Sequence, residues 1–161
     1  MFLLLLSKFH ITFAGMWLIS IVAYPVLKKN ILYNKNKICG KKFIQLYLVF
    51  ANLFGMIGGI GILTTGIITV LLNPYYGFFQ FSANPWLTTK QILMVVLLVI
   101  LAAKVIPASK KIRSLTGPGF ENNEPASGDV YTNLNSLFKW NLIMNIIVLI
   151  NFLLGITHYL F

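Results

Sequence analysis

The first apolar run, FLLLLSKFHITFAGMWLISIVAYPVL over residues 2–27, restricts the fold more than any other feature of the chain. A helix rises about 1.5 Å per residue, so a run of this length crosses a hydrocarbon layer about 30 Å thick. His10 lies well inside the run. Ionisable side chains at that depth are costly and usually face the protein interior. The run therefore predicts a membrane-spanning helix with His10 as the first candidate functional residue.

The same run differs from a secretory signal peptide. A signal peptide has basic residues before a short apolar core and then a small-residue cleavage site. Here Lys8 interrupts the run, which continues past Trp17 without an A-x-A pattern. We therefore expect a retained helix.

Three further apolar segments follow the first, in a chain of 161 residues with a hydrophobic content of 58%. This composition predicts one transmembrane domain, residues 1–161, of the all-α class. The predicted spans are residues 3–27, 43–72, 86–106 and 137–161. Prolines close the first three spans, at Pro25, Pro74 and Pro107, because proline disrupts helix interiors. The polar segments 28–42 and 108–136 are expected to be loops.

The basic residues predict the orientation of these spans. The net charge is +10, and most lysines lie in or beside the two polar segments. Loops rich in Lys and Arg stay cytoplasmic. We therefore predict a four-transmembrane-helix up-down bundle in the inner (plasma) membrane, with both termini and the aromatic 73–86 connection extracytoplasmic. Nucleic-acid binding is not expected, because it requires a basic face on a soluble domain.

The second span is rich in glycine. Gly55 and Gly59 form a G-x-x-x-G pair, which lets another helix approach closely. A nucleotide-binding loop is excluded because no strand precedes the glycines. The glycine face packs either within the monomer or in a homo-oligomer, and the sequence leaves both open.

The predicted topology places three basic side chains in one leaflet: His10, His158 and Lys90. A neutral imidazole is a good ligand for iron or copper, so His10 and His158 are candidate metal ligands. Lys90 is a candidate partner for a carboxylate such as a porphyrin propionate. Asn151 and His158 share one stripe of the fourth span, which makes Asn151 a candidate cofactor contact.

Each of these residues also has a structural interpretation. His10 and His158 can make hydrogen bonds between helices, and Lys90 can extend to the outer head groups. In this interpretation Trp17 is a packing residue, and Asn151 makes a hydrogen bond between helices. The sequence leaves both interpretations open for every one of them.

Two motifs resemble a known family. FHITFAGMW followed by Pro25 resembles the first helix of the HemJ-type protoporphyrinogen IX oxidases of bacteria, and WLTTK at 86–90 resembles the start of their third helix. The resemblance implies haem b bound within the bundle, His10 as a ligand, Trp17 beside it, and Lys90 as a catalytically required residue. It also implies oxidation of protoporphyrinogen IX to protoporphyrin IX, with electrons passed to quinone.

Two alternatives remain beside that function. The first-helix pattern is also similar, more loosely, to the copper-resistance CopD domain. That similarity implies a component for metal or haem transport, sensing or electron transfer, with His10 and His158 as ligands. The second alternative is a structural or assembly protein without a cofactor, whose polar residues serve only to join helices; in every case the lipid bilayer is an expected partner.

Overall fold

The structure, a computed structural model, describes residues 1–35, 37–116 and 126–157, and the side chains of residues 52–54 are not described. Throughout these residues the regular structure is helical, which confirms the predicted all-α class. The helices are α1 (Phe2–Tyr33), α2 (Ile38–Phe50), η1 (Ala51–Met56), α3 (Ile57–Leu72), α4 (Pro85–Ile100), η2 (Leu101–Val105), α5 (Ile106–Thr116) and α6 (Gly128–Thr157).

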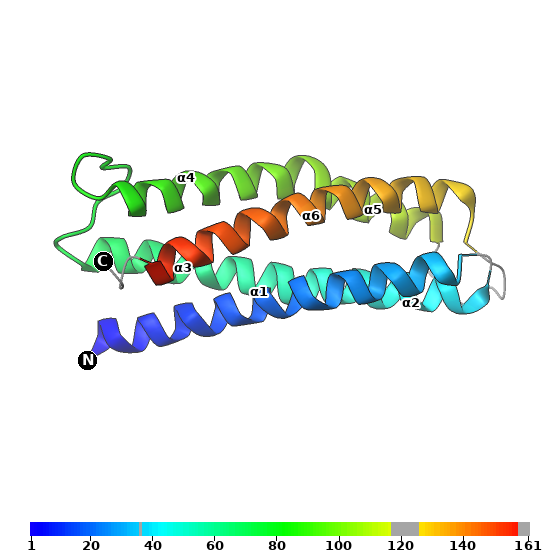
Figure 1. Cartoon of the computed structure of the whole chain (residues 1–161), viewed down its shortest axis with the longest axis horizontal. Coiled ribbons are helices and arrows are strands. Elements are labelled where there is room, and N and C mark those ends of the chain that lie inside the picture. Colours follow the sequence, from blue (N-terminus) through cyan, green and yellow to red (C-terminus); the bar gives the residue numbers. More distant parts are fainter. Residues whose placement is uncertain (36, 117–125, 158–161) are drawn as a thin grey trace.

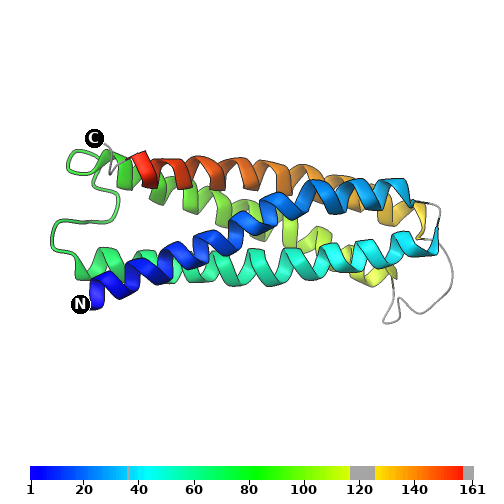
Figure 2. The ribbon, with the colours of Figure 1, turned by 60° about the horizontal axis from the view of Figure 1, so that its bottom comes forward.

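The helices form four long columns that lie side by side (Figures 1 and 2). Two columns are single helices, α1 and α6. The other two are composite, because the π-helix η1 joins α2 to α3 and the π-helix η2 joins α4 to α5. The beginning of α1 and the end of α6 lie at the same end of the molecule (Figure 1).

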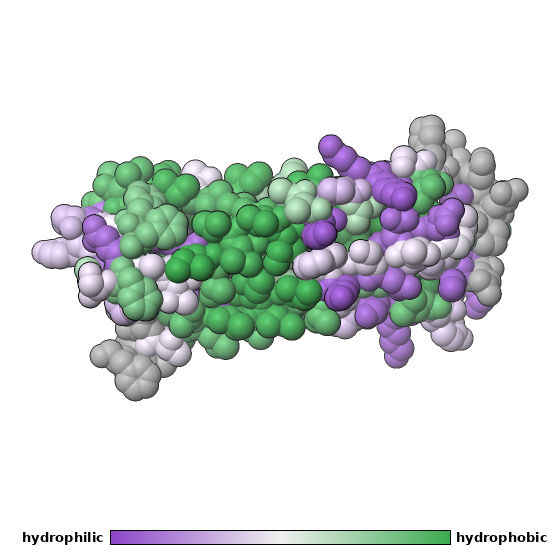
Figure 3. Space-filling view, turned by 90° about the horizontal axis from the view of Figure 1, so that it is seen from above, coloured by the Kyte–Doolittle hydropathy of each residue, from purple (hydrophilic) through white to green (hydrophobic). Residues whose placement is uncertain are grey.

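Three columns are long and apolar enough to cross a membrane: Phe2–Tyr33, Pro85–Thr116 and Gly128–Thr157. Their outer faces carry large apolar side chains, such as Ile11 (66% exposed) and Val22 (71% exposed). Figure 3 shows a broad hydrophobic belt, with hydrophilic residues gathered towards one end. Apolar surface of this extent is expected to contact lipid, so the architecture is that of a helical membrane protein.

Helix ends agree with the sequence at one end of the bundle. The helix α3 ends at Leu72, directly before Asn73-Pro74, and α4 begins at Pro85. Both were expected, because proline cannot continue a helix but fits its first turn. The 73–84 connection between them contains Phe79, which has a positive φ of 55°.

At the lysine-rich end the helices are longer than the predicted spans. The helix α1 continues through Pro25 to Tyr33, α2 begins at Ile38, and α6 begins at Gly128. The segment 28–42 is therefore mostly helical, and so is much of 108–136. Lysine is a good helix former, so a basic segment between two spans need not be a loop.

Pro107 does not end its helix, contrary to the sequence-based expectation. It is the second residue of α5, which runs on to Thr116. The π-helix η2 lies directly before it. A π-helical turn pairs backbone groups five residues apart and so absorbs the local disruption that a proline causes.

The most tightly packed core also lies at the lysine-rich end. Ile31, Ile44, Leu134 and Leu137 are fully buried there. Tyr131 of α6 stabilises the connection between α1 and α2, because its hydroxyl donates to the Lys35 carbonyl at 2.6 Å. Burying a side chain of this size contributes about 1.5–3 kcal/mol, so this end anchors the bundle.

The other half of the bundle is held by close contact between α1 and α3. A Cβ added to Gly58 would lie 3.2 Å from the Phe13 carbonyl oxygen, and one added to Gly59 would lie 2.7 Å from the Trp17 ring. A Cβ on Gly55 would meet nothing within 4 Å. Gly58 and Gly59, together with Gly61 against the Phe13 ring, thus make the close approach, and of the predicted Gly55–Gly59 pair only Gly59 contacts another helix within the monomer.

Candidate functional site

The site is built around His10, on the face of α1 that meets α3. Its Nδ1 lies 2.7 Å from the Thr65 Oγ1. The Thr65 hydroxyl also lies 2.6 Å from the Gly61 carbonyl oxygen, one helical turn back. A hydroxyl has one hydrogen to donate, and a carbonyl can only accept. Thr65 therefore donates to Gly61 and accepts from the Nδ1–H of His10.

This hydrogen bond fixes the tautomer of the imidazole. With the proton on Nδ1, the lone pair of a neutral ring is on Nε2, the atom that ligates metals or accepts protons. Gly66 lies beside the ring, since a Cβ at that position would be 3.6 Å from His10 Cε1. The helix α3 thus supplies both a hydrogen-bond acceptor and a residue without a side chain next to His10.

Lys90, in the second turn of α4, approaches the same place from the opposite column. It is close enough to His10 for the two groups to interact electrostatically. Its Nζ lies 5.8 Å from the centroid of the Trp86 ring, and 3.0 Å from where a Cβ on Gly155 would be. The ammonium group is therefore placed between an aromatic ring of α4 and a glycine of α6.

Two buried polar atoms, one on α4 and one on α6, have no hydrogen-bond partner among the described residues. They are the Asn151 Oδ1 and the Thr88 Oγ1. The Asn151 amide nitrogen donates to the Lys90 carbonyl, at a long 3.4 Å. Buried polar atoms are usually hydrogen-bonded, and unpartnered ones often mark a binding or catalytic site.

The positive charge of Lys90 is not balanced by an acidic side chain in the described part of the chain. Asp129, the one described acidic residue, is in the first turn of α6. Asn151, which contacts Lys90, lies about 33 Å further along that helix at 1.5 Å per residue. Glu121 and Glu124 lie outside the described residues. An anion bound at Lys90 would supply the missing charge.

The sequence-predicted residues thus divide into three groups. The structure places Lys90 within electrostatic range of His10, and Asn151 contacts the backbone of Lys90. It places Trp17 (4% exposed) against Gly59 and beside a separate cavity. His158 lies outside the described residues, so its predicted role as a ligand stays a prediction. No group of three or more His, Cys, Asp or Glu side chains forms a metal site in residues 1–35, 37–116 and 126–157.

Sequence reasoning missed Thr65. It is one of two adjacent threonines in an apolar span, and the chain pattern does not indicate which of the two faces His10. The one signal was position: Thr65 follows Gly58 and Gly61 at helical spacing, on the face that packs against α1.

No family model, no curated protein and no protein of known structure matches this chain. The arguments about function therefore depend on the His10–Lys90 geometry and on the resemblance of the two motifs.

Proposed function

We propose that the chain is a haem b-binding membrane oxidoreductase resembling the HemJ-type protoporphyrinogen IX oxidases. One observation carries the proposal: His10, which bonds to Thr65 through Nδ1, lies within electrostatic range of Lys90, and the one acidic side chain among the described residues is at the far end of α6. His10 and Lys90 come from distant parts of the chain, and they are the two to which the resemblance assigns function.

The residues present fit the ligation and charge of a haem. The Nε2 of His10 would ligate the haem iron, and Lys90 would pair with a propionate. Gly66 lies next to the His10 ring and Gly155 next to the Lys90 ammonium group, and neither glycine has a side chain that would obstruct a ligand there. The unpartnered Oδ1 of Asn151 would accept a hydrogen bond from a ligand or a water. His10 is the one histidine among the described residues, so it is the one residue to which we assign haem ligation.

Each residue has a defined task in this proposal. Bound haem would supply one-electron redox chemistry. Thr65 holds the proton on Nδ1 and so keeps Nε2 available. Lys90 holds a carboxylate, either of the haem or of a porphyrinogen, since both carry propionates. The apolar helices around them exclude water, which strengthens both interactions.

The proposal includes a topology. The composite column Ile38–Leu72 would cross the membrane with the other three, giving four spans in a bacterial inner membrane. The site would then lie in the outer half of the bilayer, with both chain ends extracytoplasmic. Electrons would pass to a membrane quinone.

An optical experiment tests the proposal. The detergent-purified protein, oxidised and reduced, is expected to show a b-type haem spectrum and to oxidise protoporphyrinogen IX. His10→Ala should lose the spectrum, whereas Lys90→Met should lose turnover. Lys8→Met is the matched control, because Lys8 is exposed on the same helix as His10. Spectra of equal intensity from wild type and His10→Ala would contradict the assignment of His10.

The alternatives give different results in the same experiment. A haem spectrum without porphyrinogen turnover would favour a CopD-like electron-transfer component. A colourless, metal-free preparation would contradict the proposal and favour a structural protein.

A further inference from the structure

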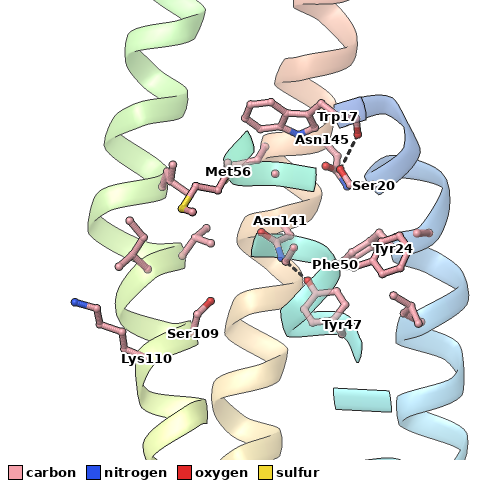
Figure 4. A pocket seen from close by; sticks show the side chains of 18 of the residues that line it. Trp17, Ser20, Tyr24, Tyr47, Phe50, Met56, Ser109, Lys110, Asn141 and Asn145 are labelled. Carbon is pink, nitrogen blue, oxygen red and sulfur yellow. Dashed lines mark hydrogen bonds between the residues drawn. The ribbon is translucent and has the colours of Figure 1, made fainter. Parts of the chain in front are cut away.

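A second site is indicated by a cavity of about 360 Å³ between the four columns, on the side of Trp17 away from His10. Figure 4 shows Trp17, Tyr24 and Tyr47 around it, with Met56 and Asn141. Small-molecule pockets in proteins range from about 300 to 1,000 Å³ and are mostly apolar with a few polar groups. The volume and the lining of this cavity match such a pocket.

The two π-helical segments of the described chain both line this cavity. The segment η1 contributes Ala51, Gly55 and Met56, and η2 contributes Leu101 and Val105. Short π-helical segments are rare and occur often at functional sites, because they widen a helix locally. Two of them facing one cavity, from different columns, indicate that the cavity is a built feature of the bundle.

The charge of the cavity comes from α5. Ile106, Ser109, Lys110 and Arg113 all line it, and their spacing of i, i+3, i+4 and i+7 is one face of a helix. Lys110 and Arg113 are exposed, so their charged groups lie at the surface beside the cavity, and the Lys110 side chain extends away from the other lining residues (Figure 4). None of the described lining residues is acidic. The cavity is thus apolar inside, with cationic groups at the surface beside it.

We propose that this cavity binds an amphipathic anion. Its hydrocarbon chain would lie between η1 and η2, and its carboxylate or phosphate head group would lie at Lys110 and Arg113. The head-group chemistry is shared by a free fatty acid and by an anionic phospholipid of the surrounding leaflet. Basic sites between helices at the cytoplasmic surface bind anionic lipid head groups in this way. His10 and Lys90 do not line the cavity, so the inference does not depend on haem binding.

Fluorescence quenching tests the inference, because Trp17 lines the cavity. The full chain with Trp86→Phe and Trp140→Phe retains Trp17 as its single tryptophan. This protein is placed in phosphatidylcholine vesicles and titrated with dibromostearate or with dibromo-phosphatidylglycerol. We expect saturable quenching of Trp17, because bromine quenches tryptophan only at short range. Dibromo-phosphatidylcholine, which has no net charge, is the comparison lipid.

Variants test where the hydrocarbon chain and the head group of the ligand bind. Gly55→Leu fills the cavity, since a Cβ there meets nothing within 4 Å, and should abolish saturable quenching. Gly15→Leu is its control, because Gly15 also has open space but does not line the cavity. Lys110→Gln and Arg113→Gln should each weaken binding by about fivefold. Lys111→Gln, exposed on the same helix but outside the cavity, should leave it unchanged.

The outcomes separate the sources and decide the proposal. Saturable quenching by dibromostearate alone identifies a free acid, and saturable quenching by dibromo-phosphatidylglycerol identifies a membrane lipid. Equal, non-saturable quenching by all three probes would overturn the proposal, because it would show only lipid surrounding the bundle. Affinity unchanged in both Lys110→Gln and Arg113→Gln would also overturn it, and these exposed substitutions do not threaten the fold.

Discussion

The imidazole of His10 depends on Thr65 for the position of its proton, and therefore for any function at Nε2. Hydrogen bonds to the second nitrogen of a ligating histidine commonly change metal affinity 10–100-fold. We predict that Thr65→Val lowers haem affinity by about this factor and broadens the haem absorption bands. Haem titration of the apoprotein, followed by absorption spectroscopy, measures both.

Two further variants test whether the effect comes from the Thr65 hydroxyl and not from a change in packing. Thr65→Ser restores the hydroxyl and should restore the spectrum. Thr64→Val removes the neighbouring hydroxyl, which is exposed and bonds to the Ile60 carbonyl at 2.7 Å, and should change nothing. A spectrum that changes equally in Thr64→Val and Thr65→Val would contradict the role of Thr65.

Lys90 illustrates how function and stability oppose each other at one residue. A cation inside a bundle, beside an imidazole and without an acidic partner in the described chain, is unfavourable for folding. We predict that Lys90→Met raises the free energy of unfolding by about 1–3 kcal/mol while it removes activity. Thermal unfolding in detergent measures the first effect. The exposed Lys8→Met should leave stability within about 0.5 kcal/mol of wild type, and a destabilised Lys90→Met would contradict the prediction.

At the level of single residues, the sequence identified side chains that stand out chemically from an apolar background. His10, Lys90 and Asn151 were found for this reason, and the structure places Lys90 near both of the others. Thr65 was missed, because threonines in apolar helices commonly bond to their own backbone, as Thr64 does. Which of two adjacent threonines faces another helix depends on the rotation of that helix, and hydropathy contains little information about rotation.

At the scale of the helices, the sequence correctly predicted the ends at the 73–84 connection but not the ends in the lysine-rich segments. Asn73-Pro74 and Pro85 mark real helix ends. Pro25 and Pro107 do not, because α1 and the α4–η2–α5 column continue past them. Lysine-rich segments are polar enough to resemble loops, but they are also good helix formers. In the structure α1 also packs against α2 and α6, and α5 packs against α6, contacts that the sequence does not display.

The contact between α1 and α3 gives a prediction about glycine. Gly58→Val should destabilise the bundle by about 1–3 kcal/mol, because the new Cβ would press on backbone atoms of Phe13 and Trp17, which cannot move cheaply. Gly55→Val has open space and should be neutral or stabilising. Chemical denaturation in detergent measures the difference. Equal destabilisation of the two variants would indicate that the Gly55–Gly59 pair makes the contact after all.

The molecule as a whole is divided along its length. The His10–Lys90 site lies at the end where α1 begins and α6 ends, whereas the tightest core and the cationic cavity lie towards the opposite, lysine-rich end. Figure 3 shows hydrophobic residues over the middle of the molecule, with hydrophilic residues gathered mainly towards one end. A bundle anchored at one end leaves the other free to accept a ligand, since local stability decreases where fewer side chains are buried.

This division makes the orientation in the membrane testable with the natural chain. Cys39 is the single cysteine, is exposed, and lies in the first turn of α2 at the lysine-rich end. Positive segments remain cytoplasmic, so we predict that a membrane-impermeant maleimide labels Cys39 in inverted vesicles but not in intact spheroplasts. The matched control is Cys39→Ser with Ser82→Cys, which moves the thiol to the exposed 73–84 connection and should reverse the pattern. Labelling of Cys39 in intact spheroplasts would place the lysine-rich end outside, and the His10–Lys90 site would then face the cytoplasmic leaflet.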